Sequence, residues 1–277
     1  MNGPRTPDSL ARELKTLWGA THLPFGAAVS QAFASPSFTQ LTQRLSQLVA
    51  VRACGMLYGP NGAGKSLLVG EFLRSLPEKR YKSFTLCHCS LSGSDLLRLL
   101  CMELGRTPRM RRSDNLAQIR AAWKQLDRLW PVLCLDEAQN LSATSLEEIR
   151  LLCCDRRDTQ APFSLLLVGD KQLLARLQMG VNAPLLDRLG FCLPLAPLDA
   201  QESRDYIQAR LEEAAIHSNP FEEAALDLLI RSADGLPRLI NHLAQRSIEA
   251  ALAQDSSTIS TTHIHNALEL MPWVAKL

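Results

Sequence analysis

The chain has 277 residues, of which 46% are hydrophobic and 21% are charged, a composition typical of a folded protein with a sizeable core. It excludes a chain that is mainly disordered or mainly coiled coil. The 30 Lys and Arg residues are nearly balanced by 28 Asp and Glu residues, and the formal net charge is +2. This balance excludes a histone-like polycation, so any contact with nucleic acid must come from a local cluster of basic residues.

No leader-like segment and no apolar run long enough to span a bilayer is evident in the sequence, so we expect a cytoplasmic protein without a membrane anchor. Most of the eight cysteines lie among apolar neighbours, as Cys134 does, and read as small buried hydrophobic residues in a reducing compartment. Cys87 and Cys89 flank His88, but this spacing differs from that of a zinc site, and no metal site is expected there.

Two helices, at 8–18 and 37–52, precede a buried strand at 53–58. Helices and strands then alternate, which predicts a parallel sheet covered by helices on both faces. The remaining expected elements of this α/β core are helices at 65–76, 94–105, 113–129 and 144–154 and strands at 83–89, 131–135 and 163–168.

Beyond Pro197 the strand pattern stops, and amphipathic helices are predicted at 199–215, 221–232, 237–254 and 261–270. Residues with high propensity for helix starts, such as Asp199 and Ser260, mark their beginnings. We therefore expect three parts: an N-terminal helix and loop at 1–36, an α/β nucleotide-binding core at 37–198, and a small all-helical lid at 199–277.

A complete G-x-x-x-x-G-K-S motif follows the first core strand and opens the next helix, which is the context in which this motif binds phosphate. Its glycines allow backbone N–H groups to surround a phosphate at the positive end of the helix. The Lys65 amine is suited to the β- and γ-phosphates of ATP, and the Ser66 hydroxyl to Mg²⁺. The expected nucleotide-binding residues of this segment are Gly59, Pro60, Asn61, Gly62, Ala63, Gly64, Lys65, Ser66 and Leu67.

An apolar strand about seventy residues later ends in two carboxylates, Asp136 and Glu137. In this position Asp136 is suited to hold Mg²⁺ and Glu137 to act as the general base that polarises the attacking water. Acidic pairs at strand ends are common by themselves, and it is the coupling to the phosphate loop that indicates a catalytic role.

Three further residues are candidates for the same site. Asp170 follows the strand at 163–168, where a γ-phosphate sensor is expected, although a helix-capping role explains an aspartate there equally well. Arg188 is a candidate arginine finger for a neighbouring subunit, unless it pairs with an acidic group of its own chain. Arg238, in the first turn of a lid helix, is placed to reach a bound nucleotide, the alternative being a solvated side chain.

Four arginines lie within seven residues in the segment GRTPRMRRSD, which contains a proline. Such density is typical of contacts with the phosphate backbone of duplex DNA, without reading of bases. A solvated surface remains the alternative. The candidate DNA-binding residues are Arg106, Arg109, Arg111 and Arg112.

These motifs together resemble the AAA+ ATPases, and more closely the branch that contains the ExeA-type secretion ATPases and the transposition regulators of the TnsC and TniB type, with the phage Mu B ATPase as a distant relative. Asp170 departs from the uncharged polar residue more usual at its position. The segments that carry the resemblance are Leu23-Pro24-Phe25-Gly26, GPNGAGKS at 59–66, LDEAQNL at 135–141, LLLVGDKQL at 165–173, RLGFCLPLAPLD at 188–199 and GLPRLINHL at 235–243.

The resemblance implies an ATP-driven homo-oligomer, a ring or a helical filament, in which Lys65, Ser66, Asp136 and Glu137 act in cis and Arg188 in trans. For the transposition branch it also implies assembly around double-stranded DNA and recruitment of a transposase. The secretion branch normally carries a membrane span and a wall-binding domain; neither is seen in this sequence, which favours transposition. An ExeA-like secretion or assembly ATPase that acts on protein partners without DNA is the alternative.

Overall fold

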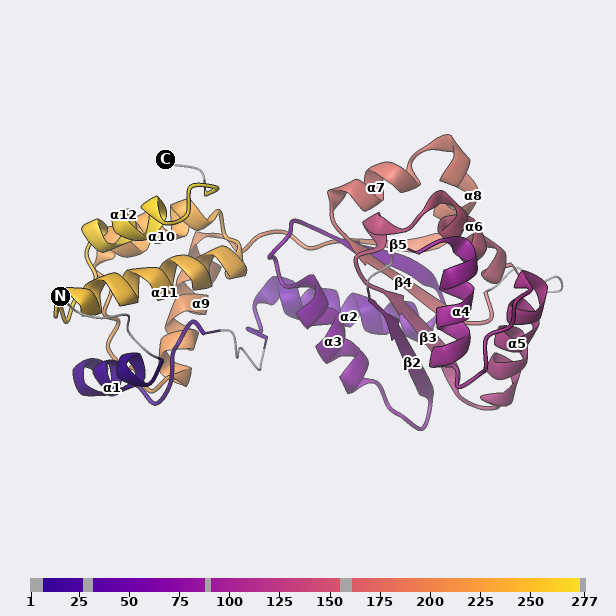
Figure 1. The fold of residues 1–277 in the computed structure, drawn as a ribbon, viewed down its shortest axis with the longest axis horizontal. Coiled ribbons are helices and arrows are strands. Elements are labelled where there is room, and N and C mark those ends of the chain that lie inside the picture. Colours follow the sequence, from indigo (N-terminus) through magenta and orange to yellow (C-terminus); the bar gives the residue numbers. More distant parts are fainter. Residues whose placement is uncertain (1–6, 27–31, 88–90, 155–160, 275–277) are drawn as a thin grey trace. The chain divides into compact units, whose positions relative to one another are not determined.

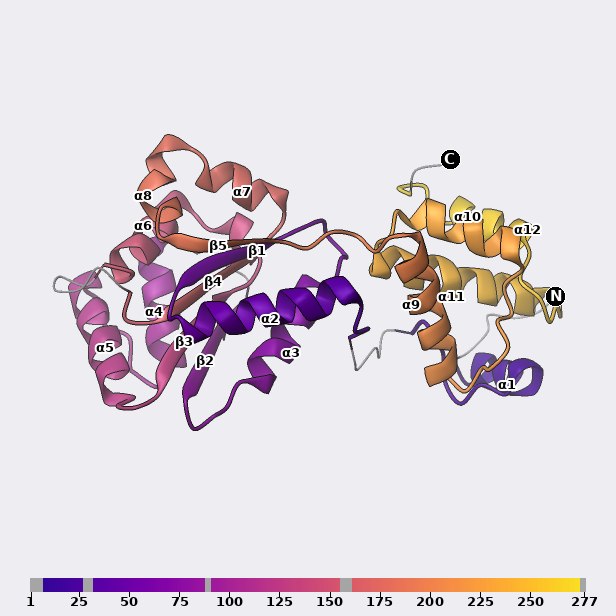
Figure 2. The same cartoon turned by 180° about the vertical axis from the view of Figure 1, so that it is seen from behind.

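The computed structural model describes residues 7–26, 32–87, 91–154 and 161–274, and it divides into two compact units (Figures 1 and 2). Unit 1 consists of Met1–Ser35, Asn61–Gly64 and Pro197–Leu277, and unit 2 of Pro36–Pro60 and Lys65–Ala196. Each unit has its own hydrophobic core.

Unit 2 contains a five-stranded sheet in the order β2-β3-β4-β1-β5, in which all neighbouring strands are parallel. This confirms the expected parallel α/β core. The central strand β4 is buried along its whole length, as a sheet covered on both faces requires. The strands are β1 (Cys54–Tyr58), β2 (Tyr81–Leu86), β3 (Trp130–Leu135), β4 (Ser164–Gly169) and β5 (Leu189–Pro194).

Helices cover both faces of the sheet (Figures 1 and 2). Alternate residues of β4 follow this arrangement, since Leu165 and Leu167 belong to the core formed with α4, α5 and α6, whereas α2 and α3 lie on the opposite side. The helices of unit 2 are α2 (Pro36–Ala50), α3 (Lys65–Ser75), α4 (Gly93–Glu103), α5 (Arg112–Gln125), α6 (Ala143–Leu152), α7 (Lys171–Leu177) and α8 (Ala183–Leu186), with short 3₁₀ turns η1 (Ala138–Asn140) and η2 (Gly180–Asn182).

Unit 1 is all helical in its regular structure and contains the expected C-terminal helices. The N-terminal segment packs into the same core: Leu14 and Phe25 are buried in it, and Trp18 donates its indole N–H to the carbonyl of Ser257 at 2.8 Å. The helices of unit 1 are α1 (Pro7–Trp18), α9 (Ala200–Glu213), α10 (Glu223–Ala233), α11 (Pro237–Ala253) and α12 (Thr261–Glu269).

Several element boundaries differ from the sequence prediction. Helix α2 ends at Ala50 and α5 at Gln125 because the chain turns shortly afterwards through Arg52 and Asp127, which adopt positive φ angles of 58° and 51°. Strand β2 begins and ends earlier than the predicted 83–89, and of the C-H-C tripeptide His88 and Cys89 lie outside the described residues. Within the described ranges, the helices include none with the length and apolar content needed to cross a bilayer.

Candidate nucleotide-binding site

The loop between β1 and α3 has the backbone that a phosphate cradle needs. A β-carbon at Gly59 would lie 2.3 Å from the carbonyl oxygen of Leu195, so only glycine fits at the end of β1. Gly62 and Gly64 adopt positive φ angles of 87° and 97°, a conformation that costs glycine little and other residues more. The glycines of the motif thus have a structural reason, and the loop delivers the chain to the N-terminus of an eleven-residue helix.

The motif lysine is held inside this loop. Lys65 is the first residue of α3 and is only 7% exposed, and its amine donates hydrogen bonds to the carbonyl oxygens of Gly59 at 2.9 Å and Pro60 at 3.0 Å. The positive charge is therefore kept at the loop that the motif assigns to phosphate. Ser66 follows as an exposed residue of the first turn.

The carboxylates Asp136 and Glu137 stand at the carboxyl end of β3. Glu137 has a left-handed backbone (φ 54°, ψ 37°), and its main-chain N–H donates to the Asp136 carboxylate at 2.9 Å, which orients the Asp136 side chain. The N–H of Asp136 donates to the carbonyl of Leu86 at the end of β2. Both carboxylates are partly buried.

Strand β4 lies between β1 and β3, so Asp170 follows a strand end that lies between the phosphate loop and the two carboxylates. The Asp170 side chain accepts a hydrogen bond from the N–H of Gln172 at 2.8 Å and caps α7. The capping role that the sequence left open is thus present in the structure. The backbone of Asp170, rather than its side chain, is directed to the neighbouring turn, where its N–H donates to the side chain of Gln139.

Two residues beside the carboxylates were not assigned to this site from the sequence. Gln139 donates from its side-chain amide to Glu137 Oε2 at 2.5 Å, and its place two residues after Glu137 in the DEAQ segment was the available signal. Cys87 follows β2 near the same carboxylates. Partial desolvation raises the pKa of the exposed Cys87 thiol, and the negative charge of Asp136 adds to this effect, so the thiol is protonated at neutral pH.

The residues present fit ATP and Mg²⁺. A helix N-terminus with a glycine-lined loop and a buried lysine suits a polyphosphate, and the Ser66 hydroxyl and the Asp136 carboxylate would supply oxygen ligands of the kind that Mg²⁺ prefers. Bound there, the cation would neutralise phosphate charge.

Arg188 lies at the amino ends of the parallel strands, whereas the phosphate loop and the carboxylates follow their carboxyl ends. It directly precedes β5, whose first residue Leu189 pairs with Cys54 at the start of β1, whereas the phosphate loop follows the end of β1. The two ends of β1 are roughly 13 Å apart, at about 3.3 Å per strand residue. The side chain is exposed, its Nη2 lies 3.0 Å from Cys154 Sγ, and within the described ranges it forms no ion pair.

Arg238 is placed next to the tip of the phosphate loop within unit 1. It is the second residue of α11, and its N–H donates to the carbonyl of Gly62 at 3.2 Å. The preceding turn needs glycine, because a β-carbon at Gly235 would lie 2.0 Å from the carbonyl oxygen of Leu198, and Gly235 has a φ of 65°. The Arg238 side chain is exposed.

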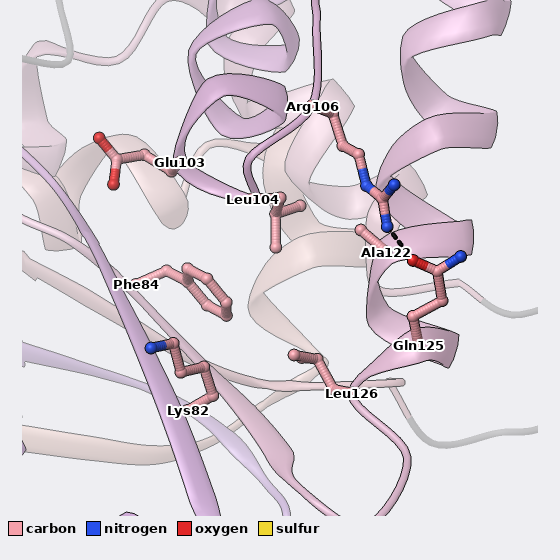
Figure 3. A pocket seen from close by; sticks show the side chains of 8 residues that line it. All are labelled: Lys82, Phe84, Glu103, Leu104, Arg106, Ala122, Gln125 and Leu126. Atoms are coloured by element: carbon pink, nitrogen blue, oxygen red, sulfur yellow. Dashed lines mark hydrogen bonds between the residues drawn. The ribbon is translucent and has the colours of Figure 1, made fainter.

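The four clustered arginines have different environments. Arg112 forms a bidentate ion pair with the buried carboxylate of Glu148, in which Nη2 lies 2.8 Å from Oε2. This hydrogen bonding raises the pKa of Arg112. Arg106 donates to Gln125 on the wall of a pocket of about 290 Å³ (Figure 3). Arg109 and Arg111 are exposed, and no side-chain bond is present for either in the described part of the chain.

The loop that carries Arg109 is fixed by Asn115, which is 1% exposed. The Asn115 side chain accepts from the N–H of Arg109 at 2.7 Å and donates to its carbonyl at 3.0 Å. Two of the four guanidinium groups are therefore engaged inside unit 2, and two are presented on a loop whose backbone is pinned.

Comparison with known proteins agrees with this geometry. Residues 49–177 match a family model described as an AAA domain. The chain is 28% identical to general secretion pathway protein A of Aeromonas hydrophila over 243 residues. The matched region is 81% of this chain and 43% of that protein. The chain spans less than half the length of the curated relatives it matches.

Among solved structures, the chain is similar to Cdc6p from Pyrobaculum aerophilum, with a TM-score of 0.71 and 17% identity over 89% of this chain and 70% of that one. It is also similar to Drosophila ORC bound to DNA, with a TM-score of 0.66 and 17% identity over 98% of this chain and 68% of that one. At such identities the likeness shows the fold, which is an AAA+ P-loop core with a parallel sheet, followed by a helical region.

Proposed function

We propose that the protein binds ATP together with Mg²⁺ at the loop after β1 and hydrolyses it. The observation that carries this proposal is the strand order, because it makes the carboxyl ends of β1, β4 and β3 neighbours in the sheet. The phosphate loop, Asp170 and the carboxylates Asp136 and Glu137 thus follow the carboxyl ends of three adjacent strands. Similarity to an AAA domain over 49–177 supports the same conclusion.

The roles of the residues follow from their chemistry. Lys65 neutralises phosphate charge, and Ser66 and Asp136 hold the cation. Glu137 accepts a proton from the attacking water, for which a carboxylate is suited once its orientation is fixed. Arg238 is proposed to contact the nucleotide, since its backbone already touches Gly62 of the phosphate loop. Asp170 is proposed to sense the γ-phosphate from the end of β4, where it also caps α7.

The active form is proposed to be a homo-oligomer in which Arg188 completes the site of a neighbouring subunit. Arg188 lies at the amino ends of the strands, away from the phosphate loop. A second copy of the chain is therefore needed to bring the Arg188 guanidinium to a nucleotide. A guanidinium there would stabilise the charge that develops on the transferred phosphoryl group.

The proposed target of the oligomer is duplex DNA, bound through its phosphates, with a transposase as the protein that it recruits. The support is the pinned loop with exposed Arg109 and Arg111, together with the resemblance of the motifs to transposition regulators. DNA is also the ligand named for the similar ORC structure. Guanidinium contacts of this kind bind DNA without selecting sequence.

A second candidate function is that of a secretion or assembly ATPase that acts on protein partners without DNA. It is favoured by the similarity to general secretion pathway protein A, which extends over 81% of this chain. In that case the arginine loop would be a solvated surface.

One experiment tests the first proposal and separates the two functions. Phosphate release from ATP is measured with the purified protein, with and without random-sequence duplex DNA. We expect Mg²⁺-dependent turnover that rises when DNA is added, because DNA promotes the assembly that completes each site. Turnover that is insensitive to DNA, with no DNA retained in the presence of ATP, would favour the assembly ATPase, and absence of turnover in every condition would refute the ATPase proposal itself.

A further inference from the structure

Gln139, in the turn η1 after β3, is bound at both ends of its side-chain amide. The nitrogen Nε2 donates to Glu137 Oε2 at 2.5 Å, and the oxygen Oε1 accepts from the N–H of Asp170 at 3.3 Å. One side chain therefore joins the end of β3 to the end of β4. The contact is close, since a β-carbon at Gly169 would lie 2.7 Å from Gln139 Oε1.

The backbone of this turn is clamped as well. The guanidinium of Arg176, on α7, donates to the carbonyl oxygens of Gln139 and Leu141. The fork geometry of arginine suits two carbonyls held side by side. Gln139 is thus fixed through its main chain by α7 and through its side chain by the residue that caps α7.

Glu137 is otherwise poorly restrained for a residue of its proposed role. Its left-handed backbone is one that non-glycine residues seldom adopt, and its main-chain N–H is used by Asp136. In the described part of the chain, the Glu137 carboxylate accepts a side-chain hydrogen bond from the amide of Gln139. The bond engages Oε2 and leaves Oε1 with both lone pairs to accept a proton.

We propose that Gln139 is a positioning residue that orients the Glu137 carboxylate and couples it to the end of β4 and to α7. This inference rests on the proposed function, in which Glu137 is the general base. A hydrogen bond to one oxygen fixes the rotation of the carboxylate without removing its basicity, as outer partners do for other catalytic groups. Because the same amide is anchored on Asp170, a shift of the α7 N-terminus changes the orientation of the base.

Three variants test this role. Gln139→Leu removes both hydrogen bonds, whereas Gln139→Glu keeps an acceptor for the Asp170 N–H and loses the donor to Glu137. We expect both to lower kcat about 10- to 100-fold while KM for ATP and the affinity for ADP stay within about twofold, because the phosphate loop is untouched. The matched control Gln178→Leu alters an exposed glutamine directly after the last residue of α7 and is expected to leave kcat unchanged.

A double variant shows whether Gln139 acts through Glu137. We expect Gln139→Leu to cause no further loss when added to Glu137→Gln, because the carboxylate that it orients is already gone. Equal melting temperatures of Gln139→Leu and the Gln178→Leu control would show that the loss is not one of folding.

The outcomes that overturn the proposal differ from those that refute the ATPase function. If the wild-type protein hydrolyses ATP and Gln139→Leu retains its kcat, the positioning role is wrong and the ATPase proposal stands. A full additional 10- to 100-fold loss in the double variant would likewise overturn it, since Gln139 would then act independently of Glu137. Absence of turnover in the wild-type protein would refute both together.

Discussion

The backbone N–H of Arg238 donates a hydrogen bond to the carbonyl of Gly62, so the first turn of α11 is tied to the tip of the phosphate loop. The approach is close enough that a β-carbon on Gly62 would lie 3.0 Å from Cβ of Arg238. A cation in the first turn of a helix is unfavourable by itself, because it meets the positive end of the helix dipole. An anionic ligand at the loop would relieve this repulsion.

Replacement of Arg238 by Ala tests that relationship. The backbone bond to Gly62 does not need the side chain, so the fold should be retained, while one charge-assisted hydrogen bond to the nucleotide is lost. Such a bond contributes about 1.5–3 kcal/mol, which corresponds to a loss of about tenfold or more in ATP affinity. Binding of a fluorescent ATP analogue measures this. Arg246→Ala, an exposed arginine on the same helix, is the control and should bind normally.

The roles of Lys65 and Glu137 should separate in binding and turnover. Lys65→Ala removes the charge held at the loop and is expected to abolish ATP binding at micromolar nucleotide. Glu137→Gln keeps the size of the side chain and removes the base, so it should bind ATP normally and lose at least about 100-fold in phosphate release, the scale of general-base catalysis. Wild-type turnover in Glu137→Gln would show that another group activates the water.

Much of the architecture could be predicted from the sequence, because apolar strands alternate with amphipathic helices and the phosphate-loop motif has a distinctive context. The ends of several helices could not. Arg52, Asp127, Ala215 and Asp255 all take positive φ angles just beyond a helix, where glycine is the usual signal. The short helices α7 and α8 were also missed, since seven and four residues carry too little periodicity.

The site itself was predictable where motifs carry it and not where tertiary contacts do. The glycine and lysine positions of the loop follow from the motif, and the position of Asp136 directly after a buried strand follows from the apolar run that precedes it. Local sequence does not reveal that Arg112 pairs with Glu148, because the partners are 36 residues apart. The bridge made by Gln139 between Glu137 and Asp170 likewise depends on the packing of β4 against β3.

Arg188 should act only across a subunit contact. Arg188→Ala is expected to bind ATP normally and to lose most of its turnover, because an arginine finger contributes on the order of 1,000-fold in comparable sites. Mixing Arg188→Ala with Glu137→Gln should restore part of the activity, since some mixed interfaces combine an intact base with an intact finger. Phosphate release across a range of mixing ratios measures the rescue. No rescue at any ratio, together with a monomer in ATP and DNA, would contradict a shared site.

The DNA contacts are best tested on Arg109 and Arg111. Both are exposed on a loop pinned by Asn115, so their replacement removes charge without loss of packing. Arg112 is unsuitable, because its removal would leave the 7% exposed carboxylate of Glu148 without this partner and would destabilise the fold. Arg106 is bound to Gln125 beside the pocket shown in Figure 3.

The double variant Arg109→Ala/Arg111→Ala is therefore expected to bind ATP normally and to bind duplex DNA more weakly. Each phosphate contact contributes about one to the slope of log K against log salt, so the slope should fall by about two. The weakening should be equal for unrelated DNA sequences, because backbone contacts carry no base readout. Arg128→Ala, on a loop at the far end of α5, is the control with an unchanged slope. Fluorescence anisotropy of labelled DNA at several salt concentrations in ATP measures both quantities. An unchanged slope and affinity in the double variant would mean that the arginine loop is a solvated surface, and it would favour the ATPase that acts on protein partners alone.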